Sequence, residues 1–268
     1  MARKASGYTG FMLQLDRITR AYELGGERAG VFNVSLEVPK GCLAVLAGPS
    51  GSGKTTLLQL AGLLDAPDAG EVRLDGEAVS SLPEKARCDL RLRRLGFVFQ
   101  AFNLVPVLSA LENVMLPLQF QGLSDEEARP RAEAALERVG LSDRRHHRPG
   151  QLSGGQQQRA AIARALAMRP EILLYDEPVT GLDPVNTASV SALILSIRER
   201  RPVTSIVVTH DIQQALEISD RVALLEHGKL RFVGPPAEFR ASEDPVVRAF
   251  ADRQAAAEAA LAILERED

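Results

Sequence analysis

A glycine-rich segment near residue 50 has the residue types and the spacing of a phosphate-binding loop. Lys54 can reach the β- and γ-phosphates of a nucleotide, and the Thr55 hydroxyl can bind Mg²⁺. Glycines let backbone N–H groups surround phosphate oxygens without interference from a Cβ. The segment reads Gly48-Pro49-Ser50-Gly51-Ser52-Gly53-Lys54-Thr55-Thr56 and fulfils the pattern G-x-x-x-x-G-K-[ST]. A plain Gly/Ser turn is the alternative, but an apolar run before it and a helical pattern after it favour nucleotide binding.

A second feature is an apolar run, residues 172–175, that ends in the carboxylates Asp176 and Glu177. In a phosphate-loop protein, an Asp at this position holds Mg²⁺, and a neighbouring Glu can polarise the attacking water as a general base. An acidic pair that caps a helix is the alternative, and the phosphate loop upstream favours the catalytic interpretation. The pattern alone leaves the division of roles open. We assign the metal to Asp176 and catalysis to Glu177.

A third segment predicts the start of a helix. Ser153 is a good N-cap, and Gln156 three residues later completes a capping box. An ordinary capped helix is therefore one interpretation. Two glycines in a first turn weaken a helix, however, and bare N–H groups at a helix N-terminus can bind an anion. The segment reads Leu152-Ser153-Gly154-Gly155-Gln156-Gln157-Gln158-Arg159.

This segment resembles the LSGGQ signature of ABC ATPases, and the resemblance runs from about residue 13 to residue 234. It implies that Gln100 is the Q-loop glutamine, which serves both catalysis and Mg²⁺ binding. It implies that Asp183 belongs to the D-loop and that His210 is the H-loop histidine at the γ-phosphate. Tyr22 is placed as the aromatic residue that stacks on adenine, with simple packing as the alternative.

The resemblance also implies how the protein works. In this family two cassettes pair head to tail, and each site combines the phosphate loop of one copy with the signature, here Leu152 to Gln156, of the other. The implied ligands are ATP and Mg²⁺. The implied partners are a second copy and integral membrane permease subunits at the cytoplasmic face of the inner membrane. An extracytoplasmic substrate-binding component is left open, and nucleic acid is not expected.

One position departs from the family pattern. The family commonly continues the acidic pair as Glu-Pro-Thr, whereas this chain has Glu177-Pro178-Val179. Valine keeps the β-branched shape but lacks the hydroxyl, which puts a minor hydrogen bond in doubt and not the reaction. Apolar residues between Phe102 and Leu108 are predicted as core of a helical lobe, and the resemblance implies that they also form a groove for a helix of the permease.

The pattern of apolar residues predicts the elements that position these groups. Residues 12–15 and 31–38 alternate as half-buried antiparallel strands do. Residues 43–47 form a continuous apolar run, and 172–175 and 205–208 are further runs typical of buried parallel strands. We therefore expect an α/β fold: a phosphate-loop NTPase core with an antiparallel β subdomain and an inserted helical lobe. The expected boundaries are 12–240 for the ATPase domain, about 102–165 for the lobe and 241–268 for a C-terminal helical extension.

The composition restricts the remaining possibilities. The chain has 268 residues and a formal net charge of −3, which does not predict binding to nucleic acid through bulk charge. Its two cysteines, Cys42 and Cys88, are far apart and favour a reducing compartment over a disulfide framework. The sequence contains no run of about 18 apolar residues, so a membrane function would depend on a partner.

Two resemblances at the subfamily level point to different substrates. Residues 96–100 and 112–118 are similar to the cassettes of lipoprotein release and macrolide-type export. Residues 174–178, 180–184 and 242–250 are similar to phospholipid-trafficking ATPases of the Mla/Mce kind. We expect lipid-related transport and leave the choice between the two open. A soluble ABC ATPase is a distant alternative, because such proteins usually join two cassettes and this chain has one phosphate loop.

Overall fold

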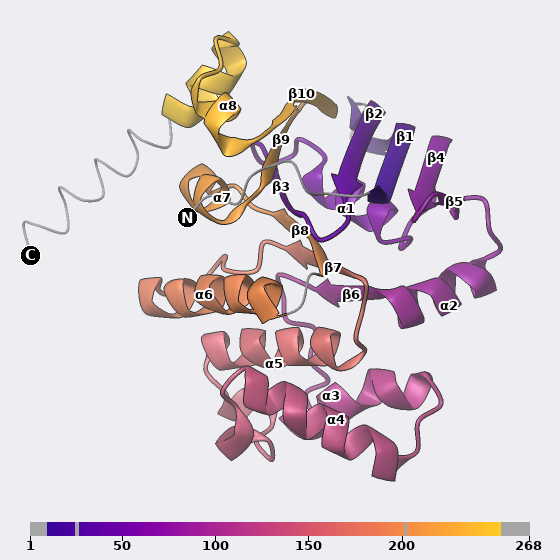
Figure 1. Ribbon diagram of the computed structural model, residues 1–268, viewed down its shortest axis with the longest axis vertical. Coiled ribbons are helices and arrows are strands. Elements are labelled where there is room, and N and C mark those ends of the chain that lie inside the picture. Colours follow the sequence, from indigo (N-terminus) through magenta and orange to yellow (C-terminus); the bar gives the residue numbers. More distant parts are fainter. Residues whose placement is uncertain (1–9, 25–26, 201–202, 253–268) are drawn as a thin grey trace, which may run out of the picture.

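Two β-sheets and a group of helices make up the fold (Figure 1). The computed structural model describes residues 10–24, 27–200 and 203–252. The smaller sheet is antiparallel along its main pairs and has the strand order β2 (Glu27–Pro39), β1 (Phe11–Leu24), β4 (Ala69–Leu74) and β5 (Glu77–Ala78). The larger sheet has the order β10 (Lys229–Gly234), β9 (Arg221–Glu226), β3 (Leu43–Ala47), β8 (Thr204–Val208), β7 (Ile172–Asp176) and β6 (Leu95–Val98).

The larger sheet is parallel from β9 to β6, and its strand order positions the site. Strand β8 lies between β3 and β7, with Val45 and Tyr175 both paired to Val207. Because the carboxyl ends of parallel strands meet at one edge, the loops that follow these three strands lie together. The phosphate loop follows β3, and the acidic pair ends β7. The α/β fold expected from the sequence is confirmed.

Both faces of the larger sheet are buried, as its continuous apolar runs predict. In β3, Leu43 and Val45 belong to a core shared with the helices, whereas Ala44 and Leu46 belong to a core shared with the smaller sheet. The helix α1 (Lys54–Ala61), which follows the phosphate loop, packs into that second core.

The other helices lie around the larger sheet, with α3 (Ala110–Phe120), α4 (Asp125–Arg138) and α5 (Gly154–Ala167) together at the bottom of Figure 1 and α8 (Pro236–Arg240) at the top. Helices α3, α4 and α5 contact one another and form the helical lobe, joined by the 3₁₀ turns η1 (Ser142–Arg144) and η2 (Pro149–Gln151). The remaining helices are α2 (Glu84–Arg94), α6 (Pro184–Arg200) and α7 (Ile212–Ile218).

Serine caps fix where the lobe helices begin. Ser109, Ser124 and Ser153 each accept a hydrogen bond from the backbone N–H three residues later. In each case the residue at that third position, Glu or Gln, returns a side-chain contact to the cap, which completes a capping box. The capping box predicted at Ser153 is therefore present.

The C-terminal part continues the fold beyond the last strand. Residues 245–252 are helical, and Val247 is fully buried in the core shared with the helices. The rest of the expected C-terminal extension, residues 253–268, lies outside the described residues. Among the described helices, none combines the length and the apolar character that crossing a bilayer requires.

Candidate functional site

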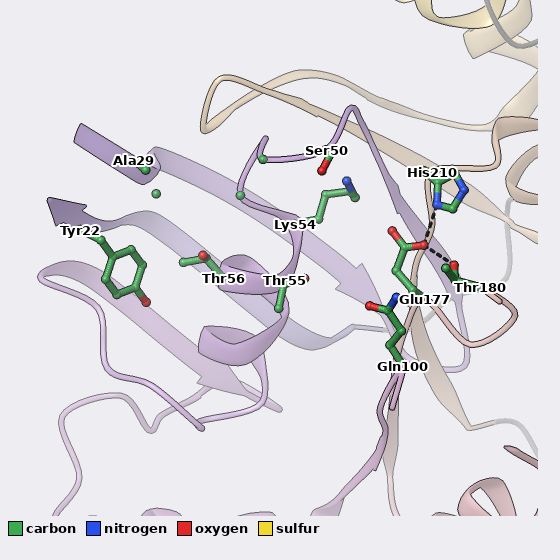
Figure 2. A pocket seen from close by; sticks show the side chains of 13 residues that line it. Tyr22, Ala29, Ser50, Lys54, Thr55, Thr56, Gln100, Glu177, Thr180 and His210 are labelled. Carbon is green, nitrogen blue, oxygen red and sulfur yellow. Dashed lines mark hydrogen bonds and ion pairs between the residues drawn. The ribbon is translucent and has the colours of Figure 1, made fainter. Parts of the chain in front are cut away.

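A cavity of about 650 Å³ opens where the phosphate loop faces the ends of β6, β7 and β8 (Figure 2). This volume is typical of small-molecule sites. The residues that line it are Tyr22, Ala29, Gly30, Ser50, Gly51, Gly53, Lys54, Thr55, Thr56, Gln100, Glu177, Thr180 and His210. Gly48, Pro49, Ser52 and Asp176 belong to the same loop and strand end without lining the cavity.

The phosphate loop makes a tight turn out of β3. Gly48 has φ +149°, and a Cβ there would lie 2.1 Å from the carbonyl oxygen of Leu225, so only glycine fits. The loop ends at Gly53, which caps helix α1 with φ +99°. Backbone N–H groups at the start of a helix attract anions. The turn therefore directs a phosphate-binding helix end toward the cavity.

The ammonium group of Lys54 is held inside this loop. Its Nζ donates to the carbonyl oxygens of Gly48 and Pro49, at 2.9 Å each. Burial lowers the pKa of Lys54, while the negative charges of Glu177 and Asp176 oppose that effect. The loop thus places one cation near the carboxylates of Asp176 and Glu177.

Asp176 and Glu177, the acidic pair, differ in their surroundings and backbone conformation. Asp176 accepts a hydrogen bond from the Thr55 hydroxyl at 3.2 Å. Burial raises the pKa of Asp176, the Thr55 hydrogen bond opposes the rise, and the nearby charge of Glu177 adds to it. Glu177 has φ +49°, a left-handed conformation that is strained for a residue with a Cβ. Strain of this kind is concentrated at functional sites.

One oxygen of Glu177 is held by two partners. Its Oε2 accepts a hydrogen bond from the Thr180 hydroxyl at 2.6 Å and lies 2.6 Å from Nδ1 of His210 (Figure 2). The carboxylate is therefore fixed at the cavity wall. Sequence reasoning assigned roles to Glu177 and His210 but missed Thr180, which restores a hydroxyl one residue after Val179.

Gln100 also lines the cavity, two residues after the end of β6. The chain then passes through Phe102 and Asn103, which have φ +59° and +51°. The guanidinium group of Arg164, on helix α5, donates to the carbonyl oxygens of both residues, at 3.0 Å for Phe102. An arginine in an alanine-rich helix offers no sequence signal for a contact with so distant a segment, and Arg164 was missed.

The signature segment lies outside this cavity. Ser153 is exposed at the start of α5, and Gly155 is buried against Asn186 at the start of α6. Asn186 also donates from its backbone and its side chain to Asp183. The signature and the D-loop are thus packed together in one chain. Neither Asp183 nor the segment from Leu152 to Gln156 lines the cavity of its own chain.

A phosphate loop that faces an acidic strand end at one edge of a parallel sheet defines a phosphate-loop nucleoside triphosphatase. Comparison with known proteins narrows this class. The family model described as ABC transporter matches residues 31–180. Since this span is more than half of the chain, the protein belongs to the ABC transporter family, as an ATP-binding subunit whose ATPase activity is coupled to transport.

Relatives of named function support the same assignment. "Lipoprotein-releasing system ATP-binding protein LolD 2" of Caulobacter vibrioides is 45% identical over 220 residues, 82% of this chain and 96% of the relative. The LolD protein of Bacteroides thetaiotaomicron is 42% identical, with 82% and 99% covered. "Methionine import ATP-binding protein MetN 1" of Listeria monocytogenes is 38% identical over 255 residues, with 87% and 75% covered.

Solved structures of ABC cassettes have the same fold as this chain. The dimeric ATP-binding cassette MJ0796, in a post-hydrolysis state with ADP and phosphate, superposes with a TM-score of 0.78 and 41% identity. The match covers 84% of this chain and 99% of that one. The ABC ATPase fold expected from the sequence is confirmed.

Proposed function

We propose that this chain powers lipoprotein release from the inner membrane, as the ATP-hydrolysing subunit of a permease complex. The observation that carries the ATP-hydrolysing part of the proposal is the cavity in which the phosphate loop, Glu177 and His210 meet. The identity of 42% to 45% with lipoprotein-releasing ATP-binding proteins, across nearly their whole length, supports the choice of substrate.

In the proposed site, the loop from Gly48 to Thr56 binds the phosphates and Tyr22 stacks on the base. Mg²⁺ would be held by Thr55, Asp176 and Gln100, because these side chains supply the oxygen ligands that this ion prefers. The 3.2 Å separation of the Thr55 and Asp176 oxygens fits a shared ligand position. When bound, Mg²⁺ neutralises charge on the phosphates.

The carboxylate of Glu177 acts as the general base. It accepts a proton from the attacking water as the water oxygen bonds to the γ-phosphorus and the bond to the ADP oxygen breaks. His210 contacts the same carboxylate and reaches toward the γ-phosphate. The strained backbone of Glu177 and its two short contacts support this role, since both orient the carboxylate before substrate arrives.

The second half of each site comes from a second copy of the chain. Ser153 to Gln156 would meet the γ-phosphate bound to the partner, so that ATP stabilises the closed dimer and hydrolysis releases it. Two features support this proposal: the helix start lies outside the cavity of its own chain, and the similar cassette MJ0796 was solved as a dimer. Asp183 packs beside the signature and would join the same interface.

The membrane partner would bind beside Gln100, on the cytoplasmic face of the membrane. Val107 is 69% exposed, whereas Leu111 nearby is buried in the lobe core. The family resemblance implies a groove for a permease helix in this segment, and Val107 would offer that helix an apolar contact. The phospholipid-trafficking alternative remains a prediction. Residues 242–250, which carry part of that resemblance, lie partly in the helix at 245–252.

Reconstitution tests the proposed function. The chain is expressed with its own genomic neighbours, and the membrane protein that co-purifies with it is placed in liposomes carrying a triacylated lipoprotein. Release of that lipoprotein on addition of Mg²⁺ and ATP is the expected result, and Lys54→Ala should abolish release together with nucleotide binding. Release of phospholipid instead, or uptake of methionine, would overturn the choice of substrate while keeping the ATPase. Co-purification with nucleic acid and no membrane protein would overturn the transport role.

A further inference from the structure

Tyr22 is held at the cavity by a cluster of three charged residues that the proposed mechanism does not use. We call this cluster, formed by Arg20, Asp65 and Asp68, the charged bracket. Its hydroxyl donates to Oδ2 of Asp65 at 2.6 Å. Arg20, on the same strand β1, donates to Oδ2 of Asp65 at 2.9 Å and to Oδ1 of Asp68 at 2.7 Å. The backbone N–H of Ala21 donates to Asp68 at 2.8 Å. Four contacts thus tie this part of β1 to the segment that follows α1.

The bracket also covers the aromatic ring. The guanidinium carbon of Arg20 lies over the Tyr22 ring, 5.1 Å from its centroid, which is within the range of a cation–π interaction. Tyr22 lines the cavity, and Arg20 does not. A stacked cation on one side leaves the ring fixed in orientation beside the space available to a nucleobase.

The charges of the bracket support one another. Burial raises the pKa of Asp65, but the hydrogen bonds from Tyr22 and the Ala66 N–H, together with the charge of Arg20, outweigh it and lower the pKa overall. Asp65 is therefore a carboxylate at neutral pH. Hydrogen bonds to a charged acceptor are stronger than those between neutral groups.

We propose that Asp65 and Arg20 are positioning residues that fix the Tyr22 ring for stacking on the nucleobase. The inference rests on the proposed nucleotide site and adds a structural link within it. Asp65 follows helix α1, and α1 begins with Lys54 of the phosphate loop. Helix α1 and the turn after it thus connect the phosphate loop to the carboxylate that binds the Tyr22 hydroxyl.

The physical advantage of the bracket is preorganisation. A free tyrosine side chain loses rotamer freedom when a ligand orders it, and that loss weakens binding. A ring that is already fixed avoids this cost. The bracket should therefore strengthen binding of ligands that carry a base and leave binding of the phosphates unchanged.

A comparison of two ligands tests this inference. Dissociation constants are measured for Mg²⁺-ATP and for inorganic tripolyphosphate, which has no base. Asp65→Ala should weaken ATP binding by about five- to tenfold and change tripolyphosphate binding by less than about twofold. The turnover number for ATP should stay unchanged while KM rises. Asp65→Asn, which keeps a hydrogen-bond acceptor, should recover part of the loss.

A double substitution isolates the route through Tyr22. In a Tyr22→Ala background, Asp65→Ala should have no further effect on ATP affinity, because its target is gone. If Asp65→Ala does not fold, Tyr22→Phe takes its place, because it keeps the ring and removes the hydroxyl that binds Asp65. A partial loss of ATP affinity is then expected. Asp75→Asn, which removes the exposed ion pair with Lys40, is the matched control.

The outcomes separate the inference from the proposed function. Equal loss of ATP and tripolyphosphate binding, or additive effects of Asp65→Ala and Tyr22→Ala, would overturn the positioning role. A wild-type protein that bound tripolyphosphate but gained nothing from the base would also overturn it. Failure of the wild type to bind either ligand would instead overturn the nucleotide site itself.

Discussion

The carboxylate of Glu177 lies 2.6 Å from the imidazole of His210, although the two residues are 33 positions apart in the sequence. They meet because β7 and β8 are adjacent parallel strands, and each residue follows the end of its strand. Thr180 donates to the same carboxylate oxygen at 2.6 Å. The carboxylate that we propose as the general base is thus held by His210, which follows the next strand, and by Thr180 from its own loop.

Thr180→Val should slow hydrolysis while leaving nucleotide binding intact. The substitution keeps the side-chain shape and removes the hydroxyl that orients Glu177, so the turnover number should fall by about tenfold at unchanged KM. Thr180→Ser, which keeps the hydroxyl, should retain most of the activity. Steady-state ATPase assays on purified protein measure both.

Val179→Thr is the matched control for that experiment. It introduces the residue that the family commonly carries next to Pro178, at a position whose side chain packs against the core. Because Thr180 already supplies a hydroxyl to Glu177, the substitution should leave the turnover number within about twofold of the wild type. A large gain from Val179→Thr, with no loss from Thr180→Val, would show that Thr180 does not orient the base.

Arg164→Leu should loosen the segment after Gln100. It removes the donor for the carbonyl oxygens of Phe102 and Asn103, whose left-handed backbones need support. A loss of about 1–3 kcal/mol of stability is expected from the unpaired carbonyls, together with a lower turnover number. Thermal unfolding and ATPase assays report the two effects.

Arg131→Leu controls for the general loss of an arginine. Arg131 donates to the carbonyl oxygen of Ala167 at 3.0 Å and does not line the cavity. Its removal should lower the melting temperature without changing turnover at a temperature where the protein is folded. Equal effects of both substitutions on turnover would contradict a specific role for Arg164.

Gly155→Ala should destabilise the fold through a local clash. A Cβ at this position would lie 2.1 Å from the side-chain oxygen of Asn186, whose amide nitrogen donates a hydrogen bond to Asp183. Overpacking of this kind costs about 1–3 kcal/mol. In an Asn186→Ala background the penalty of Gly155→Ala should largely disappear, as a cycle of four melting curves would reveal. Additive losses would mean that the contact with Asn186 is not the cause.

The stability contributed by Asp65 should depend on pH with a defined sign. Because its folded-state pKa lies below the ordinary value for aspartate, the folded state favours the carboxylate, and the contribution is present at pH values above about 4. The melting temperature of the wild type should exceed that of Asp65→Asn at pH 7, and the difference should shrink as the pH falls toward the folded-state pKa. A difference that grew on acidification would contradict the charged bracket.

Local sequence patterns predict the elements of this fold because buried strands consist mainly of apolar residues, which can be recognised in the sequence. The runs at 43–47, 172–175 and 205–208 are apolar apart from Ser205 and the Tyr175 hydroxyl, and they form three adjacent strands with both faces covered. The phosphate loop and the acidic pair are likewise motifs of consecutive residues, so the sequence predicts them directly. Parallel pairing then brings them to one edge of the sheet.

Contacts between segments that are distant in the sequence have no such local pattern and could not be predicted. The bond between Tyr22 and Asp65 joins residues 43 positions apart, and Arg164 reaches the Phe102 carbonyl across 62 positions. Gly155 illustrates a related limit. Its sequence context favours anion binding, whereas the structure adds a steric reason, the close approach of Asn186. Such contacts depend on how helices and strands pack, and any of several residue types can make them.

The most direct test of a site shared between two copies is the oligomeric state of Glu177→Gln. This substitution removes the carboxylate that we propose as the general base and keeps the shape of the side chain, so ATP should bind without being hydrolysed. Analytical ultracentrifugation of the purified variant should show a dimer with Mg²⁺-ATP and a monomer with Mg²⁺-ADP. Adding Ser153→Arg at the signature should abolish the dimer while ATP still binds. A Glu177→Gln protein that binds ATP but stays monomeric would contradict the shared site.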